Sequence, residues 1–470
     1  MTTLPQSAPT PVLHKLIGLL LIAVTALVTL REWGHTSLAD PLTFALWTVL
    51  VAVLFPTVRP GRKGFVVVAV ALTAMLIWRV PDWQEIVAQA MVSGTFIAAF
   101  FTALATLRSA AEPSPEIREA GSFLARQPPG RRYLALTLGG TAFALLLNYG
   151  SITLLGSLAT AAAREEPDAE IRGHRRRRML LAIQRGFVTS LPWSPLGFSV
   201  AITTALIPGA TWAGIILPAL GTALLMAFVG WGIDTLFKPR LTTTPPPRGR
   251  PDNNWAKLKP LAWLLAILVV STAVLGWLTG LRIIALVLVI APVMALAWTV
   301  MQVRQGRLPL RIRLRDYAFR EMPAYRSEVL LLTMAGYIGT VGAPLLAPLV
   351  KASGFHPEDL PTWVVLVGLV WIIPLLGQFA MNPIIVVTLI APLLPSTAEL
   401  GISPAALVTA ITAGWALGGV SSPFTATTLL IGAFGDVSAR HVGVIWNGAY
   451  MLVLLAAVPL WVLAYAYLFG

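Results

Sequence analysis

The sequence has no cysteine among its 470 residues, so a disulfide, a thiolate nucleophile and a thiolate metal site are all excluded. It also lacks a glycine-rich phosphate loop and a recognisable serine-nucleophile motif. The five histidines, which fall in or near polar segments and form no zinc-binding cluster, are His14, His35, His174, His356 and His441. These absences argue against an enzyme, and we expect no cofactor other than sodium ions.

Charged residues are scarce, at 11% of the chain, whereas a soluble protein has about 25%. Hydrophobic residues make up 57%, and apolar segments of roughly 20 residues recur from Ile17 to Leu468. That length is what a helix needs to cross a hydrocarbon layer of about 30 Å. The sequence therefore predicts an all-α polytopic membrane protein. Its first apolar segment has no convincing small-residue cleavage site, so we expect a retained helix.

The distribution of basic residues predicts the orientation in the membrane. Predicted spans are 16–31, 41–57, 64–81, 88–107, 133–147 with 149–163, 180–207, 212–237, 260–279, 283–302, 328–350, 363–381 with 383–398, 404–433 and 441–468. With the N-terminus inside, the outside loops hold only Arg31, Arg79, Arg282 and Lys351, and nearly all the other Lys and Arg fall in inside loops. This positive-inside bias predicts a bacterial inner-membrane protein with a cytoplasmic N-terminus and an external C-terminus. The net charge of +14 and the run "HRRRR" at 174–178 then set topology rather than bind nucleic acid.

Carboxylates are missing from the predicted membrane interior. A proton/sodium antiporter normally needs one there, so their absence counts against antiport. Arg185 lies nine residues before Ser194, about 13 Å along a helix. It either extends to the inside interface or offers a positive charge to an anion that enters from inside. Gln184, Gln378 and Asn447 are neutral candidates for helix–helix hydrogen bonds.

A polar, proline-rich segment at 238–259 divides the chain near its midpoint and is predicted to be a cytoplasmic linker. It separates a first repeat, 36–237, from a second repeat, 260–470, and residues 1–35 form an additional N-terminal transmembrane helix. Each repeat has three spans, an apolar pair interrupted by one asparagine, a span broken at Ser-Pro, and a last span. The first pair enters from the inside and the second from the outside. The two repeats are therefore predicted to be inverted, each with a re-entrant helical hairpin and a broken transmembrane helix.

The interruptions occur in matching order. Asn148 precedes Ser194 by 46 residues, and Asn382 precedes Ser422 by 40 residues. A proline ends a helix because it lacks an N–H donor, and a broken helix survives in hydrocarbon only where protein or a wet cavity surrounds the break. Interrupted segments at corresponding positions of two inverted halves point to a transporter site near the midplane.

The residues at these interruptions suit ion binding. Serine or asparagine followed by proline is typical of a helix start, so Ser194, Asn382 and Ser422 are predicted to begin half-helices. Such starts expose N–H groups and favour an anion, whereas unwound carbonyls favour a cation such as sodium. The predicted substrate-binding residues are Asn148, Thr189, Ser190, Ser194, Asn382, Ser421, Ser422 and Thr425. The predicted cation-binding residues are Asn148, Trp193, Asn382 and Ser421.

At these motifs the chain resembles the ion transporter superfamily, especially the divalent anion–sodium symporters. That family carries Ser-Asn-Thr at two hairpin tips, matching Asn148 and Asn382, and unwound turns similar in place to 193–197 and 421–425. The resemblance implies an elevator mechanism, in which a transport domain slides against a dimeric scaffold. It also implies that tip asparagines and carbonyls hold sodium while hydroxyls hold a carboxylate. Here the serine and threonine partners are absent at both tips, which leaves fewer hydroxyls for a dicarboxylate.

The predicted function is a secondary active transporter that moves a small organic anion, a carboxylate, coupled to sodium or protons. Its predicted partners are the lipid bilayer and a second copy of the chain in a homodimer. Three alternatives stay open: an efflux permease for an inorganic oxyanion or hydroxide, a sodium/proton antiporter of the same superfamily, and a channel or structural subunit.

Overall fold

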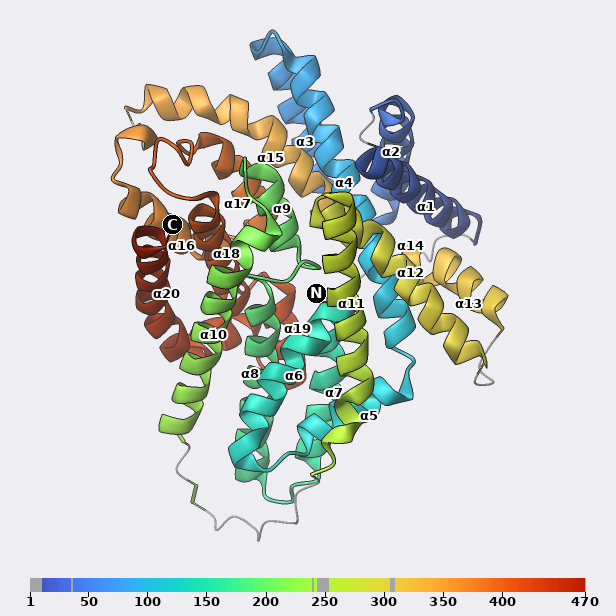
Figure 1. Ribbon diagram of the computed structural model, residues 1–470, viewed down its shortest axis with the longest axis vertical. Coiled ribbons are helices and arrows are strands. Elements are labelled where there is room, and N and C mark those ends of the chain that lie inside the picture. Colours follow the sequence, from blue (N-terminus) through green and yellow to red (C-terminus); the bar gives the residue numbers. More distant parts are fainter. Residues whose placement is uncertain are drawn as a thin grey trace. The chain divides into compact units, whose positions relative to one another are not determined.

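A computed structural model gives the fold of the chain (Figure 1), and it describes residues 11–34, 37–238, 241–242, 253–304, 309–354 and 356–469. Regular structure in these residues is helical throughout. Ten of the described helices are long and apolar enough to cross a membrane, which confirms the predicted all-α polytopic membrane class. Most of the predicted linker at 238–259, and His35, lie outside the described residues.

The chain divides into two compact units. Unit 1 consists of Met1–Ala110 and Leu275–Leu349, and unit 2 consists of Ala111–Val274 and Val350–Gly470. Both predicted repeats contribute to both units. The three early spans of the first repeat and the second and third spans of the second repeat lie mostly in unit 1, whereas the span at 260–279 is divided between the units. The predicted hairpin, broken helix and last span of each repeat lie in unit 2.

Unit 1 contains α1 (Pro11–Gly34), α2 (Asp40–Leu54), η1 (Phe55–Thr57), α3 (Pro60–Arg79), α4 (Trp83–Ala111), α12 (Ile283–Arg304), α13 (Leu310–Asp316), η3 (Tyr317–Glu321), α14 (Met322–Ala324) and α15 (Arg326–Ala352). A buried polar bridge joins three of them. The Trp47 indole of α2 donates to the Thr333 hydroxyl of α15 at 2.8 Å, and that hydroxyl donates to the Gly94 carbonyl of α4 at 2.6 Å. Because each buried polar group has a partner, the bridge adds specificity without an unsatisfied donor.

Unit 2 contains α5 (Pro115–Ala125), α6 (Pro129–Leu147), α7 (Gly150–Arg164), α8 (Ala169–Ser190), α9 (Phe198–Leu206), α10 (Trp212–Leu236), η2 (Trp255–Leu258), η4 (Pro357–Asp359), α16 (Thr362–Gly377), α17 (Pro383–Ile390), η5 (Ala391–Leu393), α18 (Pro404–Ser421), α19 (Ala426–Gly435), η6 (His441–Trp446) and α20 (Gly448–Leu468). Helix α11 (Lys259–Thr279) starts in unit 2 and ends in unit 1. Several starts are fixed by side-chain caps, in which Ser114, Asp168, Thr211 and Ser403 accept a backbone N–H of the first turn.

The helical pairs and the broken helices occur where the sequence predicts them. The pairs are α6 with α7 and α16 with α17, and the broken helices are α8 with α9 and α18 with α19. In Figure 1, α6, α7 and α8 form one group of neighbouring helices, and all three pack on each other. Most predicted spans begin and end within about five residues of the observed helices, but α8 begins at Ala169, 11 residues before the predicted start at 180, and α17 ends at Ile390, before the predicted end at 398.

Helices α6 and α8 approach each other at the level of their backbones. A Cβ atom added to Gly186 of α8 would lie 2.4 Å from the Thr137 carbonyl oxygen of α6. One turn further on, the Thr141 hydroxyl donates to the Gly186 carbonyl at 2.8 Å. Small residues allow such close contacts between membrane helices, where packing and hydrogen bonds replace the hydrophobic effect as the driving force.

Replacing Gly186 with alanine should lower the free energy of unfolding by about 1–3 kcal/mol, because the carbonyl that the new methyl group meets belongs to a helix backbone. Gly173→Ala in the same helix is the matched control, since nothing lies within 4 Å of the added Cβ. It should be neutral or stabilise by about 0.5–1 kcal/mol. Thermal unfolding of both variants in detergent measures the difference. Equal melting temperatures would contradict the close contact.

Candidate functional site

The first break separates α8 from α9 and is caused by two prolines. The Leu191 carbonyl would normally accept from the residue four positions on, but that residue is Pro195, which has no N–H. The Ser199 hydroxyl donates to this carbonyl instead. Within the turn, the Ser194 hydroxyl oxygen accepts from the Leu196 N–H at 3.2 Å. Side-chain oxygens thus replace the missing helical hydrogen bonds.

The second break, between α18 and α19, repeats this arrangement. The Gly419 carbonyl faces Pro423 in the sequence, and the Thr427 hydroxyl donates to it. The Ser422 hydroxyl oxygen accepts from the Phe424 N–H at 3.3 Å. In both breaks a hydroxyl eight residues after the freed carbonyl donates to it. The two breaks therefore correspond residue by residue in their hydrogen bonds, as well as in their order along the chain.

The structure corrects the predicted starts of the second half-helices. Ser194 and Ser422 were expected to be caps, but α9 begins at Phe198 after Gly197, and α19 begins at Ala426 after Thr425. Each serine hydroxyl accepts from the amide two residues on, as a cap does, but each serine carbonyl accepts from the residue three positions on, Gly197 or Thr425, so a turn forms before the helix begins. Neither Gly197 nor Thr425 provides a side-chain cap.

The two hairpin tips differ from each other. At the first tip, Asn148 has φ 50° and ψ −132°, close to the values at the first central position of a type II′ turn. Its carboxamide makes no hydrogen bond to another described residue, whereas its carbonyl accepts from Ser151. At the second tip, Asn382 caps α17 as predicted, and its side-chain oxygen accepts from the Ile384 N–H at 2.9 Å.

Each broken helix is hydrogen-bonded to the hairpin of its own repeat. The Ser422 hydroxyl donates to the Gly377 carbonyl at the end of α16 at 2.6 Å, and the Gln378 amide donates to the Ser421 hydroxyl at 3.2 Å. In the first repeat, the hydroxyls of Thr141 (α6) and Thr189 (α8) are 2.8 Å apart.

The second half of each broken helix packs instead on the hairpin of the other repeat. Helix α9 packs on α17, and α19 packs on α7. Phe434 of α19 lies so close to Gly156 of α7 that an added Cβ would be 2.7 Å from its ring. Both hairpins and both breaks therefore belong to one packed assembly within unit 2.

Several predicted ligands are already engaged by the protein. Ser190 donates to the Phe187 carbonyl at 2.7 Å, and the Trp193 carbonyl accepts from the Trp212 indole at 2.9 Å. Thr425 donates to the Ser422 carbonyl at 2.9 Å. Of the eight predicted substrate-binding residues, Asn148 is the one whose side chain makes no hydrogen bond to a described residue.

Arg185 is buried, with a relative exposure of 3%. This corrects the interpretation that it extends to the interface. Its guanidinium lies 4.2 Å from the centroid of the Tyr450 ring and donates to the Tyr133 hydroxyl at 3.2 Å. It forms no ion pair with a described carboxylate, since Asp234 is bound by Arg178 at 2.6 Å. A buried charge without a counter-charge is costly, which makes such a residue a functional candidate.

A chain of hydrogen bonds, the Arg185 relay, connects this charge to the second break. The Asn447 side-chain oxygen accepts from the Arg185 Nε at 3.2 Å, and the Asn447 amide donates to the Gln184 oxygen at 2.9 Å. The Gln184 amide then donates to the carbonyls of Val420 at 3.3 Å and Gly419 at 3.5 Å. Because arginine can only donate, it fixes the orientation of both carboxamides. The sequence marks these residues only as separate polar side chains and gives no sign that they meet.

The arrangement of helices resembles that of known transporters. The fold is similar to that of transporters of the AbgT family, which belongs to the ion transporter superfamily. The crystal structure of the Alcanivorax borkumensis YdaH transporter matches with a TM-score of 0.56 and 16% sequence identity, covering 85% of this chain and 98% of that one. Neisseria gonorrhoeae MtrF, described as one of a class of antimetabolite efflux pumps, matches with a TM-score of 0.50 and 13% identity, covering 89% and 97%.

These matches establish the fold. No protein-family model matches the sequence, and no curated protein does. The structural neighbours are transporters, not enzymes. The similarity is one of fold, so the ion transporter superfamily and the closer resemblance to the divalent anion–sodium symporters stay predictions for this chain.

Replacing Asn447 with leucine should lower the free energy of unfolding by about 2–5 kcal/mol, because the buried Arg185 and Gln184 both lose a partner. Asn447→Asp should cost less, since a carboxylate supplies Arg185 with a counter-charge. Thermal unfolding of the two variants in detergent measures both effects. An Asn447→Leu variant as stable as the wild type would show that the Arg185 relay contributes nothing to the free energy of unfolding.

Proposed function

We propose that the chain is a secondary active transporter that moves a small organic anion across the bacterial inner membrane, coupled to sodium or protons. The observation that carries this proposal is the matched hydrogen bonding of the two breaks. Two unrelated kinks would not share a freed carbonyl, a proline and a rescuing hydroxyl at the same spacing. Two hairpins packed across the repeats complete an assembly that can surround a small solute.

Electrostatics favour an anion at this assembly. The half-helices α7, α9 and α19 start without a side-chain cap, so their first N–H groups have no side-chain acceptor. A helix start carries roughly half a positive charge, and exposed N–H groups bind carboxylates directly. Arg185 adds a full positive charge to the same unit, and it has no described carboxylate partner. We assign the centre of the site to Asn148, Ser194, Asn382 and Ser422.

The division into two units supports an elevator mechanism. Unit 2 holds both hairpins and both broken helices, which suits a moving transport domain, and unit 1 suits a scaffold that forms the homodimer. We place the N-terminus in the cytoplasm and the C-terminus outside because of the positive-inside distribution of Lys and Arg.

Efflux is the second candidate direction of transport. It is favoured by the similarity to MtrF, which is described as one of a class of antimetabolite efflux pumps.

The backbone at the first tip allows a clean test of Asn148. A glycine tolerates φ 50° better than asparagine does, so Asn148→Gly removes the carboxamide while keeping or improving stability. If the carboxamide binds the solute or its coupling ion, transport into proteoliposomes should be abolished. Melting temperature in detergent is the control. Wild-type transport by a folded Asn148→Gly protein would remove Asn148 from the site.

Asn382 needs a different substitution because it also caps a helix. Serine preserves the cap but removes the amide, whereas alanine removes both and should cost about 1 kcal/mol. We expect both variants to lose transport and only the alanine variant to lose stability. Full transport by Asn382→Ser would mean that Asn382 caps α17 and does not bind the solute or its coupling ion.

The substrate class and coupling ion can be measured together. Purified protein is melted in the presence of a panel of carboxylates and oxyanions, each in sodium and in potassium. A ligand that binds only the folded state at 100 times its dissociation constant adds about 2.7 kcal/mol. We expect one carboxylate class to raise the melting temperature, and a requirement for sodium would identify the coupling ion. An absence of any shift would contradict an anion site.

A further inference from the structure

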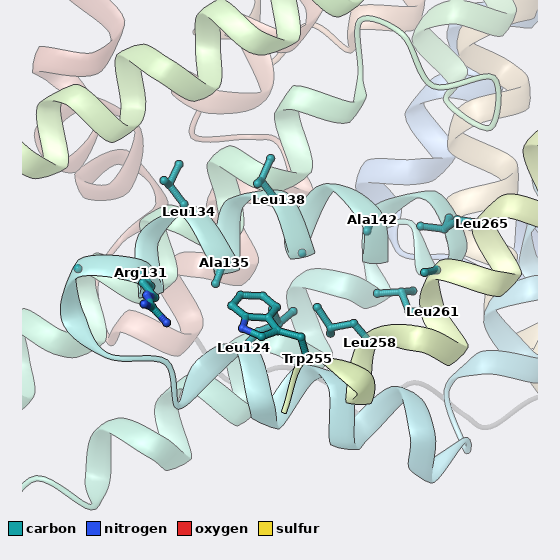
Figure 2. A pocket seen from close by; sticks show the side chains of 13 residues that line it. Leu124, Arg131, Leu134, Ala135, Leu138, Ala142, Trp255, Leu258, Leu261 and Leu265 are labelled. Carbon is teal, nitrogen blue, oxygen red and sulfur yellow. The ribbon is translucent and has the colours of Figure 1, made fainter. Parts of the chain in front are cut away.

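An apolar groove of about 480 Å³ runs along unit 2 (Figure 2). One wall is α6, the other is formed by η2 and the first part of α11, and Leu124 at the end of α5 also lines it. None of the predicted substrate-binding or cation-binding residues lines this groove. It is therefore separate from the hairpin tips and the breaks.

The length of the groove matches one leaflet of a bilayer. Along α6 it extends from Gly130 to Ala142, which is about 18 Å at 1.5 Å per residue. Half of a hydrocarbon layer of about 30 Å is 15 Å. Along the other wall it extends from Trp255 to Leu265. Both walls start near the same end of the groove, which we call the mouth, because the Arg131 side chain on α6 is hydrogen-bonded to Asn253, two residues before Trp255.

The walls are shaped for a hydrocarbon chain. Leu134 and Leu138 on α6 and Leu261 and Leu265 on α11 are large and apolar, and Ala135, Ala142 and Ala262 leave space between them. Figure 2 shows the labelled leucines along the two helical walls, with Arg131 at one end, Leu265 toward the other and Trp255 between them. Away from Arg131, the groove offers a bound molecule little to hydrogen-bond.

The mouth has the chemistry of a lipid headgroup site. The exposed Arg131 donates to the neutral Asn253 side chain at 3.3 Å and forms no ion pair with a described carboxylate. Its neighbour Lys257 is paired with Glu119 at 3.6 Å. Trp255 is 46% exposed and packs edge-on against Phe123. Tryptophan is enriched at membrane interfaces, and arginine binds phosphate through charge-assisted hydrogen bonds.

We propose that an anionic phospholipid binds to unit 2, with one acyl chain in this groove and its phosphate on Arg131. The occupant is amphiphilic because a leaflet-long apolar channel ends at a single cation that no described carboxylate neutralises. Basic sites between membrane helices are known to select anionic headgroups. The lipid joins the outer face of the first hairpin to α11, the helix that leads out of unit 2.

The test measures lipid binding in detergent by native mass spectrometry and by melting temperature. Phosphatidylglycerol, phosphatidylcholine and inorganic phosphate are compared on the wild type, Arg131→Gln and Ala262→Phe. We expect phosphatidylglycerol to be retained and to raise the melting temperature more than phosphatidylcholine does. Arg131→Gln should weaken retention of phosphatidylglycerol about five- to tenfold and remove the preference between the lipids. Ala262→Phe, which fills the groove, should reduce retention of both lipids.

Matched controls separate these effects from general surface changes. Arg118→Gln removes an exposed arginine of the same unit, and Ala456→Phe adds a ring at an exposed position on α20, so both should bind lipid as the wild type does. An unchanged lipid preference in Arg131→Gln would overturn the proposal. So would full lipid retention by a folded Ala262→Phe. A thermal shift that inorganic phosphate alone reproduces would also overturn it, because the site would then bind a free anion. Because Arg131 is exposed, Arg131→Gln should fold as the wild type does. The proposal can therefore be tested with this variant even if Ala262→Phe does not fold.

Discussion

Everything in unit 2 depends on how the backbone groups freed by proline find hydrogen-bond partners away from water. In hydrocarbon an unsatisfied carbonyl costs several kcal/mol, so a broken helix is stable only when each freed group is bonded. Here a hydroxyl of the following half-helix reaches back across each break, from Ser199 to Leu191 and from Thr427 to Gly419. These two hydrogen bonds satisfy the freed carbonyls, so that each helix can stay broken while the surrounding structure stays folded.

This requirement gives the hydroxyls near the site a structural role in place of the ligand-binding role that the sequence suggests. Most of them satisfy the backbone, so few remain free to bind a solute in the described state. The groups without a side-chain hydrogen bond are of other kinds: the first N–H groups at three uncapped helix starts and the carboxamide of Asn148. Asn148 also holds a backbone conformation that asparagine adopts at some cost. Strain of that kind is often found where a side chain must be aimed at a ligand.

The sequence predicts the large features because they have strong local causes. Proline and asparagine interrupt apolar runs, and the positions of Asn148, Asn382 and the two Ser-Pro pairs are enough to place hairpins and breaks. The helix starts inside the breaks could not be predicted, since Ser194 forms a turn or a cap depending on contacts made later in the chain. The Arg185 relay could not be predicted either. It joins α8 to Asn447, the residue before α20, across 262 residues, and no local pattern encodes such a contact.

The Arg185 relay bears directly on which ion could bind at the second break. The last carbonyls of α18 carry the negative end of a helix dipole and would suit a cation. Gly419 and Val420 already accept from the Gln184 amide, and Gly419 also accepts from Thr427. A sodium ion at these carbonyls would have to displace donors whose orientation a buried arginine fixes. In this state the end of α18 is neutralised from within the protein, which makes the positive ends of the uncapped helix starts better suited than this negative end to bind a charged solute.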